Sequence, residues 1–369
     1  MRIVYCGGAS GGHVYPAIAI MKAIEKRVPR VQSVFVGTAD SIEESICTRE
    51  NLPFLTIPSR PIKRKFSFDI FKTLLTVDEG MQKSIRLLRS VKPDLVIGTG
   101  GYVAGPFVFQ AAANDVPTLI HEQNAYPSLT NRILGLRVDV AALTFDESRR
   151  HLPWWLKKYT LGNPIRTEFL SIKREQGISD LNLNPDLKTL LVVQGSLGSA
   201  TINELFIKAL PSILADENLQ VVFVTGQKHY EHVETVLKDK DIWLEPRLKV
   251  EPYLFNIGSA LAAADLIISR AGGMIAEINA MGLPAIYIPS PYVAENHQEH
   301  NARAIENQGA AVMLREKELD ANLLINTILS LINDEEKMAS MKERALRLAR
   351  PEAADDIADL ALKLLRKEL

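Results

Sequence analysis

The sequence has little cysteine, no excess of either charge and no long hydrophobic run. Its two cysteines, Cys6 and Cys47, have no spacing that suggests a disulfide framework or a metal cage. The formal net charge of -1 excludes a general basic field for nucleic acid. No run reaches the roughly eighteen apolar residues of a membrane-spanning helix, and the apolar run after Met1 is too short for a secretory signal. We therefore expect a protein of the reducing cytoplasm that binds no nucleic acid.

The 369 residues, of which 47 % are hydrophobic, are enough for two domains with separate cores. Short β-branched runs alternate with stretches of helical period, which indicates parallel sheets with crossover helices. The predicted strands are 3–6, 34–36, 54–57, 95–97 and 118–120, then 190–193, 221–224, 248–250, 266–268 and 285–288; the clearest helices are 16–28, 70–88 and 105–114. The fold class is therefore α/β.

The turn Gly162-Asn163-Pro164 separates the two sets of strands. We predict two Rossmann-like domains, residues 1–163 and 164–350, that face each other across a cleft. The end of the chain, 335–369, is predicted helical apart from a break at Pro351, and its last part, 351–369, has the option of packing back on the first domain. Loops at the carboxyl ends of such strands are where ligands bind.

Two glycine-rich loops follow strands of the first half, Gly7 to His13 and Gly98 to Gly105. The first of these loops fits neither the dinucleotide-binding nor the P-loop spacing, which disfavours hydride transfer and NTPase chemistry. His13 is a candidate general base, because histidine titrates near neutrality; the alternative is a helix-start residue that only bonds the loop.

A row of polar residues, His121-Glu122-Gln123-Asn124, follows the strand at 118–120. Such a row is costly in a core and natural at the ligand edge of a sheet, although a solvated loop capped by Asn124 is the alternative.

Three loops of the second half also follow predicted strands and contain glycine or polar residues. The run 194–199 includes Ser196, whose hydroxyl suits a phosphate, and 269–273 precedes Glu277, which suits ribose hydroxyls or simply stabilises the start of a helix. The run 296–301 contains His297 and His300, but its amide side chains suit sugar hydroxyls better than a metal ion.

Taken in order, these motifs resemble the MurG family within glycosyltransferase family 28, whose members transfer N-acetylglucosamine from UDP-N-acetylglucosamine to lipid I and form lipid II. The resemblance covers nearly the whole chain. It rests on Gly7 to His13, Gly98 to Gly105, 121–124, Asn163 to Arg166, Gly195-Ser196, 269–272, and His297-Gln298 with Asn301. The chain departs from the family in Ser10, where threonine is usual, and in a loop between Arg270 and Glu277 that is one residue shorter.

The resemblance implies a GT-B fold, the donor on the C-terminal domain and the lipid acceptor on the N-terminal domain. It implies an inverting reaction in peptidoglycan synthesis that requires no cofactor or metal, with His13 as the base and Glu122 as the alternative. The implied substrate-binding residues are Ser10, Gly11, Gly12, Asn124, Arg166, Ser196, Leu254, Gly272, Glu277, His297, Gln298 and Asn301. A transferase acting on diacylglycerol, a UDP-sugar epimerase and a non-catalytic UDP-sugar-binding protein are the competing hypotheses.

The segment 60–72 combines five basic residues with three phenylalanines. Such a segment suits an anionic membrane surface, and a solvated loop leading into a core helix is an equal alternative. The expected contacts are Lys63, Arg64, Lys65, Phe66, Phe68 and Phe71. We expect a peripheral protein on the cytoplasmic face of the membrane, with other cell-wall synthesis proteins as further partners. Trp154-Trp155, beside Pro153, is expected to pack near the 162–164 turn rather than contact lipid.

Overall fold

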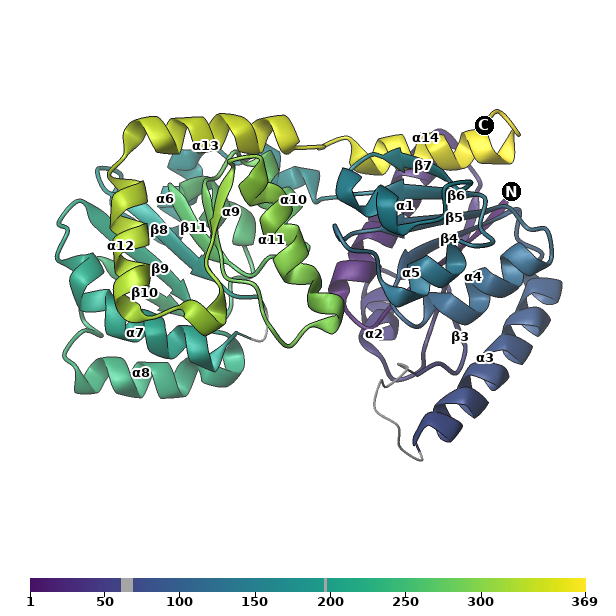
Figure 1. The fold of residues 1–369 in the computed structure, drawn as a ribbon, viewed down its shortest axis with the longest axis horizontal. Coiled ribbons are helices and arrows are strands. Elements are labelled where there is room, and N and C mark those ends of the chain that lie inside the picture. Colours follow the sequence, from purple (N-terminus) through teal and green to yellow (C-terminus); the bar gives the residue numbers. More distant parts are fainter. Residues whose placement is uncertain (61–68, 196–197) are drawn as a thin grey trace. The chain divides into compact units, whose positions relative to one another are not determined.

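The computed structural model describes residues 1–60, 69–195 and 198–369, with the backbone alone for residues 69–74. The chain forms two compact units (Figure 1). The first comprises Met1–Ile165 together with Arg350–Leu369, and the second comprises Arg166–Ala349. Each unit is built on its own parallel sheet and is described separately.

The sheet of the first unit has seven strands in the order β3-β2-β1-β4-β5-β6-β7. Every neighbouring pair is parallel. The strands are β1 (Arg2–Gly7), β2 (Gln32–Gly37), β3 (Phe54–Thr56), β4 (Leu95–Gly100), β5 (Thr118–Glu122), β6 (Val140–Leu143) and β7 (Lys157–Thr160). Strands β1 and β4 lie in the middle, so the glycine loops that follow them start side by side.

Both faces of this sheet are covered by helices, because successive residues of a strand point to opposite sides. Tyr5 packs among buried residues of α1 (Gly11–Arg27), α2 (Ile42–Arg49) and α14 (Ala353–Leu365). Its neighbour Cys6 packs among residues of α3 (Asp69–Val91), α4 (Ala104–Ala113) and α5 (Leu129–Leu134). The last helix, α14, lies beside α1 and is fastened by Arg27, whose Nε donates to Asp359 at 2.6 Å (Figure 1).

The second unit has six parallel strands in the order β10-β9-β8-β11-β12-β13. They are β8 (Lys188–Val193), β9 (Leu219–Val224), β10 (Leu248–Glu251), β11 (Leu266–Ser269), β12 (Ala285–Tyr287) and β13 (Ala311–Met313). Its helices are α6 (Arg174–Leu181), α7 (Ala200–Leu214), α8 (Tyr230–Asp239), α9 (Ile257–Ala263), α10 (Ile275–Ala280), α11 (His297–Asn307), α12 (Ala321–Ile332) and α13 (Glu335–Leu348). Short 3-10 helices are η1 (Asp146–His151) in the first unit, and η2 (Thr167–Ser171), η3 (Gln227–His229), η4 (Ala294–Asn296) and η5 (Glu316–Glu318) in the second.

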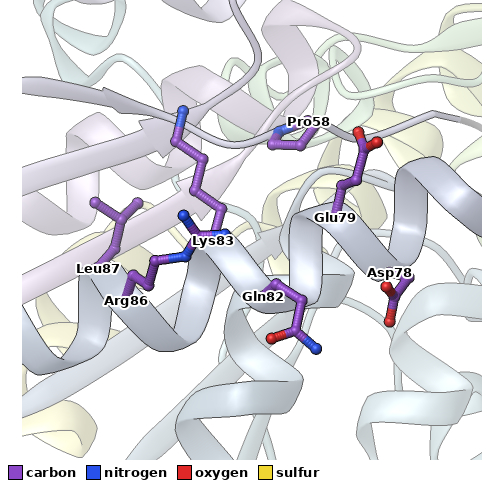
Figure 2. A pocket seen from close by; sticks show the side chains of 7 residues that line it. All are labelled: Pro58, Asp78, Glu79, Gln82, Lys83, Arg86 and Leu87. Carbon is purple, nitrogen blue, oxygen red and sulfur yellow. The ribbon is translucent and has the colours of Figure 1, made fainter.

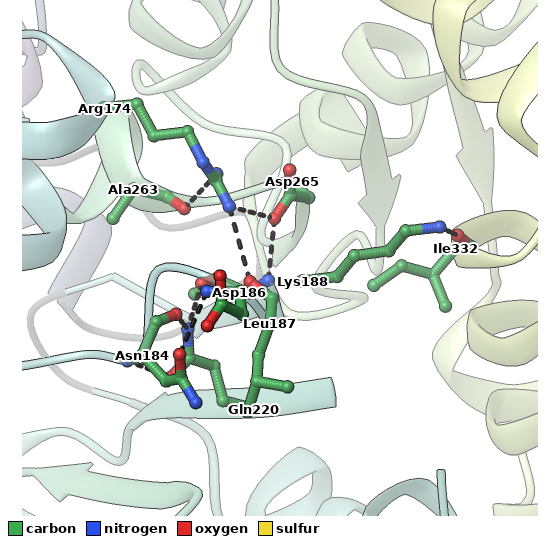
Figure 3. Close-up of polar contacts among 10 residues, drawn as sticks. Arg174, Asn184, Asp186, Leu187, Lys188, Gln220, Ala263, Asp265 and Ile332 are labelled. Carbon is green, nitrogen blue, oxygen red and sulfur yellow. Dashed lines mark hydrogen bonds and ion pairs between the residues drawn. The ribbon is translucent and has the colours of Figure 1, made fainter. Parts of the chain in front are cut away.

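Polar clamps hold the amino-terminal edge of the second sheet (Figure 3). The carboxylate of Asp265, just before β11, accepts from the backbone N–H of Thr189 at 2.7 Å and from Arg174 at 3.0 Å. Gln220 on β9 and Asn184 exchange two hydrogen bonds, at 2.9 and 2.8 Å. Because all the strands are parallel, the loops that follow them lie at the opposite, carboxyl edge.

The predicted α/β class with two Rossmann-like parallel sheets is confirmed. Three strands were not predicted: β6, β7 and β13. The first helix also begins earlier than predicted, at Gly11, so Pro16 lies in its second turn. Among the described residues, no helix combines the length and the apolarity that crossing a bilayer requires.

Candidate active site

The first glycine loop changes directly into α1. Ser10 has extended backbone at the N-cap, and Gly11, Gly12 and His13 form the first turn of the helix. The Ser10 hydroxyl and His13 Nδ1 lie 3.0 Å apart, in hydrogen-bonding contact. This contact fixes the orientation of the imidazole at the carboxyl edge of the sheet, which is the arrangement that a general base needs.

The loop after β4 packs closely against the first loop, which explains its glycines. Thr99 Oγ1 donates to the carbonyl of His13 at 2.7 Å. At Gly100 (φ +105) an added Cβ would lie 2.7 Å from Cδ2 of His13. At Gly101 (φ +79) it would lie 2.4 Å from the carbonyl oxygen of Gly8. Side chains at these two positions would therefore force the two loops apart.

A buried carboxylate that the sequence analysis did not single out lies beneath the first loop. Glu43, in the first turn of α2, is 1 % exposed. It accepts from the hydroxyl of Thr38 at 2.7 Å, from the N–H of Thr38 at 3.2 Å and from the N–H of Ala9 at 3.2 Å. Ala9 has a left-handed backbone, with φ of 69°. The Ala9 bond therefore holds the loop in a conformation that alanine rarely adopts.

Glu122 supports the loop between β5 and α5. Its Oε1 accepts from the N–H and the side-chain amide of Asn124 at 2.9 and 3.1 Å. Its Oε2 accepts from the N–H of Ser128 and from Nδ2 of Asn131, both at 2.9 Å. Burial raises the pKa of Glu122, and these hydrogen bonds lower it. Both oxygens are engaged in holding the loop, which positions Asn124 and makes Glu122 a poorly placed proton acceptor for a substrate.

His121 and Gln123, the other members of the polar row, connect neighbouring segments. His121 is completely buried, and its Nε2 lies 3.0 Å from the carbonyl oxygen of Gly162. Burial lowers the pKa of His121 to about 4, so the ring is neutral at physiological pH. The side chain of Gln123 donates to the carbonyl of Thr99 at 3.2 Å, which ties the β5 loop to the β4 loop.

In the second unit the structure pairs two predicted donor-binding residues. Arg166 Nε lies 3.0 Å from Glu277 Oε1, in the first turn of α10. The guanidinium also stacks 4.3 Å from the centre of the Phe169 ring. The side chain of Arg166 is half-exposed, whereas that of Glu277 is 12 % exposed. The positive guanidinium of Arg166 is therefore accessible to solvent, and the carboxylate of Glu277 beside it is largely covered.

Open space lies at the glycines of two loops in this unit. Apart from the glycine and its two chain neighbours, no described atom lies within 4 Å of a Cβ added at Gly195, Gly272 or Gly273. Gly195 has a left-handed backbone, with φ of +84°, which favours glycine, whereas packing does not explain Gly272 and Gly273. The N–H of Gly272 donates to the carbonyl of Arg270 at 3.0 Å, and the open space beside the loop leaves its backbone accessible to a ligand.

An ion pair with little solvent exposure lies behind these loops, and it was also not singled out from the sequence. The guanidinium of Arg270 donates to the hydroxyl of Ser199 and to the carbonyl of Ile288, both at 2.9 Å. It also lies 2.6 Å from the carboxylate of Glu316. Arg270 thereby joins the start of α7, the end of β12 and η5, and it keeps three loops in register.

Two predicted residues that follow β12, Gln298 and Asn301, form hydrogen bonds within the protein. Gln298 Oε1 accepts from the N–H of Ser290 at 2.8 Å, which orients its amide. Asn301 is buried and donates to the carbonyl of Ala271 at 3.1 Å, so it braces the loop that contains Gly272.

The remaining predicted residues are distributed as follows. His297 Nδ1 lies 2.8 Å from the carbonyl of Ala294, and burial lowers the pKa of His297. Leu254 is half-buried in the loop after β10. Ser196, Lys63, Arg64, Lys65, Phe66 and Phe68 lie outside the described residues, and for Phe71 only the backbone is described. Within residues 1–60, 69–195 and 198–369 no group of three or more histidine, cysteine or acidic side chains is arranged to hold a metal ion.

Both units of the chain match the domains of a known protein family. Residues 3–142 match the glycosyltransferase family 28 N-terminal domain, and residues 189–358 match the glycosyltransferase family 28 C-terminal domain. The chain belongs to glycosyltransferase family 28. It is therefore a glycosyltransferase, and its two units correspond to the two domains of that family.

Family members resemble this chain along its whole length. A Desulforamulus reducens protein is 40 % identical over 371 residues, 100 % of both chains, and one from Bacillus subtilis is 41 % identical over 96 % of this chain and 97 % of its own. Both are named UDP-N-acetylglucosamine--N-acetylmuramyl-(pentapeptide) pyrophosphoryl-undecaprenol N-acetylglucosamine transferase.

Solved structures agree with the expected GT-B fold. The crystal structure of Acinetobacter baumannii MurG is 26 % identical, with a TM-score of 0.78 over 98 % of this chain and 99 % of that one. A UDP-GlcNAc 2-epimerase from Neisseria meningitidis, bound to UDP-GlcNAc, has a TM-score of 0.69 over 98 % of this chain and 100 % of its own. At 14 % identity the epimerase shows the shared fold alone.

Proposed function

We propose that this chain transfers N-acetylglucosamine from UDP-N-acetylglucosamine to the 4-hydroxyl of the N-acetylmuramyl group of lipid I, and so forms lipid II for peptidoglycan. One observation carries the proposal. Curated relatives about 40 % identical over essentially the whole chain bear the name of this transferase, whereas the epimerase bound to UDP-GlcNAc is 14 % identical.

The donor is assigned to the loops of the second unit. The half-exposed guanidinium of Arg166 suits the diphosphate, because it presents positive charge and N–H donors to oxygen. The loop that contains Gly272 has open space beside its backbone, which suits the close approach of a ligand. Glu277 engages Arg166 through Oε1, and its carboxylate suits the ribose hydroxyls. In this assignment the backbone at Leu254 contacts uracil, Gln298 reads the hydroxyls of the sugar, and Ser196 contacts the diphosphate.

The reaction is a single displacement with inversion. The acceptor oxygen forms a bond to the anomeric carbon while the bond from that carbon to the diphosphate oxygen breaks, and UDP leaves with the electron pair. Arg166 and the helix N-termini stabilise the negative charge that develops on the diphosphate, so we propose that no metal or other cofactor is required.

The proton of the acceptor hydroxyl goes to His13. With Nδ1 protonated and donating to the Ser10 hydroxyl, Nε2 is the nitrogen that accepts the proton. Glu122 is the weaker candidate, because four hydrogen bonds from the β5–α5 loop engage its oxygens. We assign it a positioning role for Asn124.

A lipid-borne acceptor requires the enzyme to work at a membrane. We propose peripheral attachment to the anionic cytoplasmic face, with other cell-wall synthesis proteins as partners. The basic and aromatic segment 60–72 supports this attachment by composition.

The deciding experiment is transfer of radiolabelled N-acetylglucosamine from its UDP donor to purified lipid I, with diacylglycerol and UDP-glucose as controls. We expect label in lipid II with lipid I alone. Label on diacylglycerol, or a rearranged sugar that remains on UDP, would contradict the proposal. His13→Ala should lose turnover while it binds UDP as the wild type does, and unchanged turnover would exclude His13 as the base.

A further inference from the structure

Arg166, which the proposed function assigns to the donor diphosphate, is the first residue of the second unit and the N-cap of η2. Its guanidinium is held on two sides. Nε donates to Glu277 Oε1 at 3.0 Å, and Cζ lies 4.3 Å from the centre of the Phe169 ring. Among the residues that the structure describes, neither Nη nitrogen has an acceptor. The half-exposed side chain therefore offers these two nitrogens to a ligand.

The contact between Arg166 and Phe169 follows from the 3-10 geometry of η2. The N–H of Phe169 donates to the carbonyl of Arg166 at 3.3 Å, and the N–H of Ile172 donates to the carbonyl of Phe169 at 3.1 Å. In a 3-10 helix, residues that are three apart lie one above the other. These three side chains are therefore on one face of the turn, and the ring of Phe169 lies beside the guanidinium.

An edge of the Phe169 ring packs on α9. A Cβ added at Gly258, the second residue of α9, would lie 2.6 Å from Cδ1 of Phe169 and 2.9 Å from Cδ1 of Ile172. Glycine at this position therefore allows the ring to approach the helix. The ring is half-buried and is confined between α9 and the guanidinium. This contact fastens residues 166–181, which we call the arginine arm, to α9.

Two further contacts hold the arginine arm on α9. A Cβ added at Gly177 of α6 would lie 2.3 Å from the carbonyl oxygen of Ser259, so α6 and α9 are in close contact. At the start of α6, Arg174 donates to the carbonyl of Ala263 at the end of α9, at 2.7 Å (Figure 3). Because α9 begins three residues after Leu254, the arginine arm and the loop assigned to uracil are fixed to the same helix.

We propose that Phe169 is a positioning residue for the donor, whose ring holds the guanidinium of Arg166 with its two Nη nitrogens toward the diphosphate. The ring fixes the plane of the guanidinium, and the pair with Glu277 fixes its rotation within that plane. A guanidinium held in this way donates two N–H bonds to phosphate oxygens and loses little side-chain freedom on binding. The inference rests on the proposed function, in which Arg166 binds the diphosphate of the donor.

Binding of UDP and of uridine by the full chain tests this role, because only UDP carries the diphosphate. Phe169→Leu keeps an apolar side chain against Gly258 but removes the ring, so calorimetry should show UDP binding weakened at least about threefold, as for one lost cation–π contact. In an NMR titration, uridine should bind Phe169→Leu as it binds the wild type. Phe169→Tyr keeps the ring and should bind UDP within about twofold of the wild type.

A substitution on α9 reaches the same contact from the other side. Gly258→Ala adds a Cβ that displaces the Phe169 ring, and it does not weaken α9 itself because alanine is the better helix former. We expect this variant also to bind UDP at least about threefold more weakly. In an Arg166→Ala background, Phe169→Leu should have no further effect on UDP binding, because the ring then has no guanidinium to hold.

Leu87→Ala is the matched control for the loss of a half-buried apolar side chain. Leu87 lies on α3 in the first unit, where it lines a hollow of about 440 Å³ together with Lys83 and Arg86 (Figure 2). It packs against the core of that unit and belongs to no loop assigned to the donor, so this variant should bind UDP as the wild type does. Urea unfolding of each variant establishes that the protein used for binding is folded.

A loss of UDP affinity smaller than about threefold in Phe169→Leu would overturn the inference. An equal loss of uridine affinity would also overturn it, because Phe169 would then act on the whole donor site through α9 and not through Arg166. A further loss in the Arg166→Ala background would have the same meaning. Failure of the wild type to bind UDP would instead contradict the proposed function. These measurements contain no lipid, so they do not depend on the identity of the acceptor.

Discussion

Replacing Glu43 tests whether a buried carboxylate holds the first glycine loop. Glu43→Ala removes the acceptor for three donors, the hydroxyl and N–H of Thr38 and the N–H of Ala9. A buried donor left without a partner costs about 1–3 kcal/mol, but these three donors are only partly buried and water reaches them in the space left behind, so we expect a loss of about 2–3 kcal/mol in unfolding free energy. Glu43→Gln keeps one accepting oxygen but turns an NH2 group toward a backbone N–H, and it should lose about 1–2 kcal/mol.

The assay for Glu43 combines urea unfolding with separate measurements of donor binding and turnover. We expect Glu43→Gln to bind UDP-N-acetylglucosamine normally, because the donor is assigned to the other unit, while its kcat falls as Ala9 and the start of α1 loosen around His13. Glu44→Gln is the matched control, since Glu44 is the next residue and bonds Asp40 instead of the loop. A folded Glu43→Ala protein with wild-type kcat would refute the reasoning.

Three further predictions concern stability and the donor loops. Burial lowers the pKa of His121 in the folded protein to about 4, against about 6.5 for an exposed histidine, so the fold favours the neutral ring. Stability should therefore fall by up to about 3 kcal/mol as pH drops from 6.5 to 4. His121→Gln, which keeps a donor for the carbonyl of Gly162, should flatten that part of the pH dependence of the unfolding free energy. Gly272→Leu places a side chain in space that no described atom outside the neighbouring residues occupies within 4 Å, so the unfolding free energy should stay within about 1 kcal/mol of wild type. Calorimetry should show donor binding weakened at least about tenfold. Unchanged binding would remove this loop from the donor site. Glu316→Ala leaves the guanidinium of Arg270, which is 12 % exposed, without its carboxylate and should cost about 2–4 kcal/mol in urea unfolding. A loss below about 1 kcal/mol would show that the pair is not structurally required.

The central strands were predictable because they are buried on both faces. Runs such as 95–97 and 190–193 have no polar interruption, and the structure confirms them as parts of β4 and β8. One missed strand, β6 (Val140–Leu143), is apolar and buried throughout, so its signal was present and was overlooked. The other two missed strands lack that signal. β7 reads Lys157–Thr160, is partly exposed at the edge of its sheet and shows no apolar run, while β13 has only three residues. At an edge, strand formation is decided by the neighbouring strand, which a local pattern does not contain.

The sequence predicted the loops of the candidate site but not the side chains that hold these loops in place. Glycine runs that follow strands are visible in the sequence, and so is the acid Glu277 near a helix start. Glu43 bonds Ala9 across 34 positions, and Arg270 reaches Glu316 on another element, so neither partnership has a local pattern. Trp154 and Trp155 were expected to pack near the 162–164 turn, but they are 86 % and 56 % exposed. The buried positions of this segment are taken by Leu152 and Leu156 on either side, so the two tryptophans between them are left on the surface.

The side chains that hold these loops share one property, which predicts the effect of mutating them. Several loops assigned to ligands are held by an ionisable side chain with little exposure: Glu43 beside the first glycine loop, Glu122 beside the β5–α5 loop, and Arg270 behind the loops of the second unit. A charged group accepts or donates several strong bonds at once, so it orders a glycine-rich segment that has no side chains of its own to pack. The loop backbone then remains available to substrate. Neutral isosteres at these three positions should therefore lower kcat or donor affinity well before they unfold the protein, whereas substitutions within the loops should act on ligand binding directly.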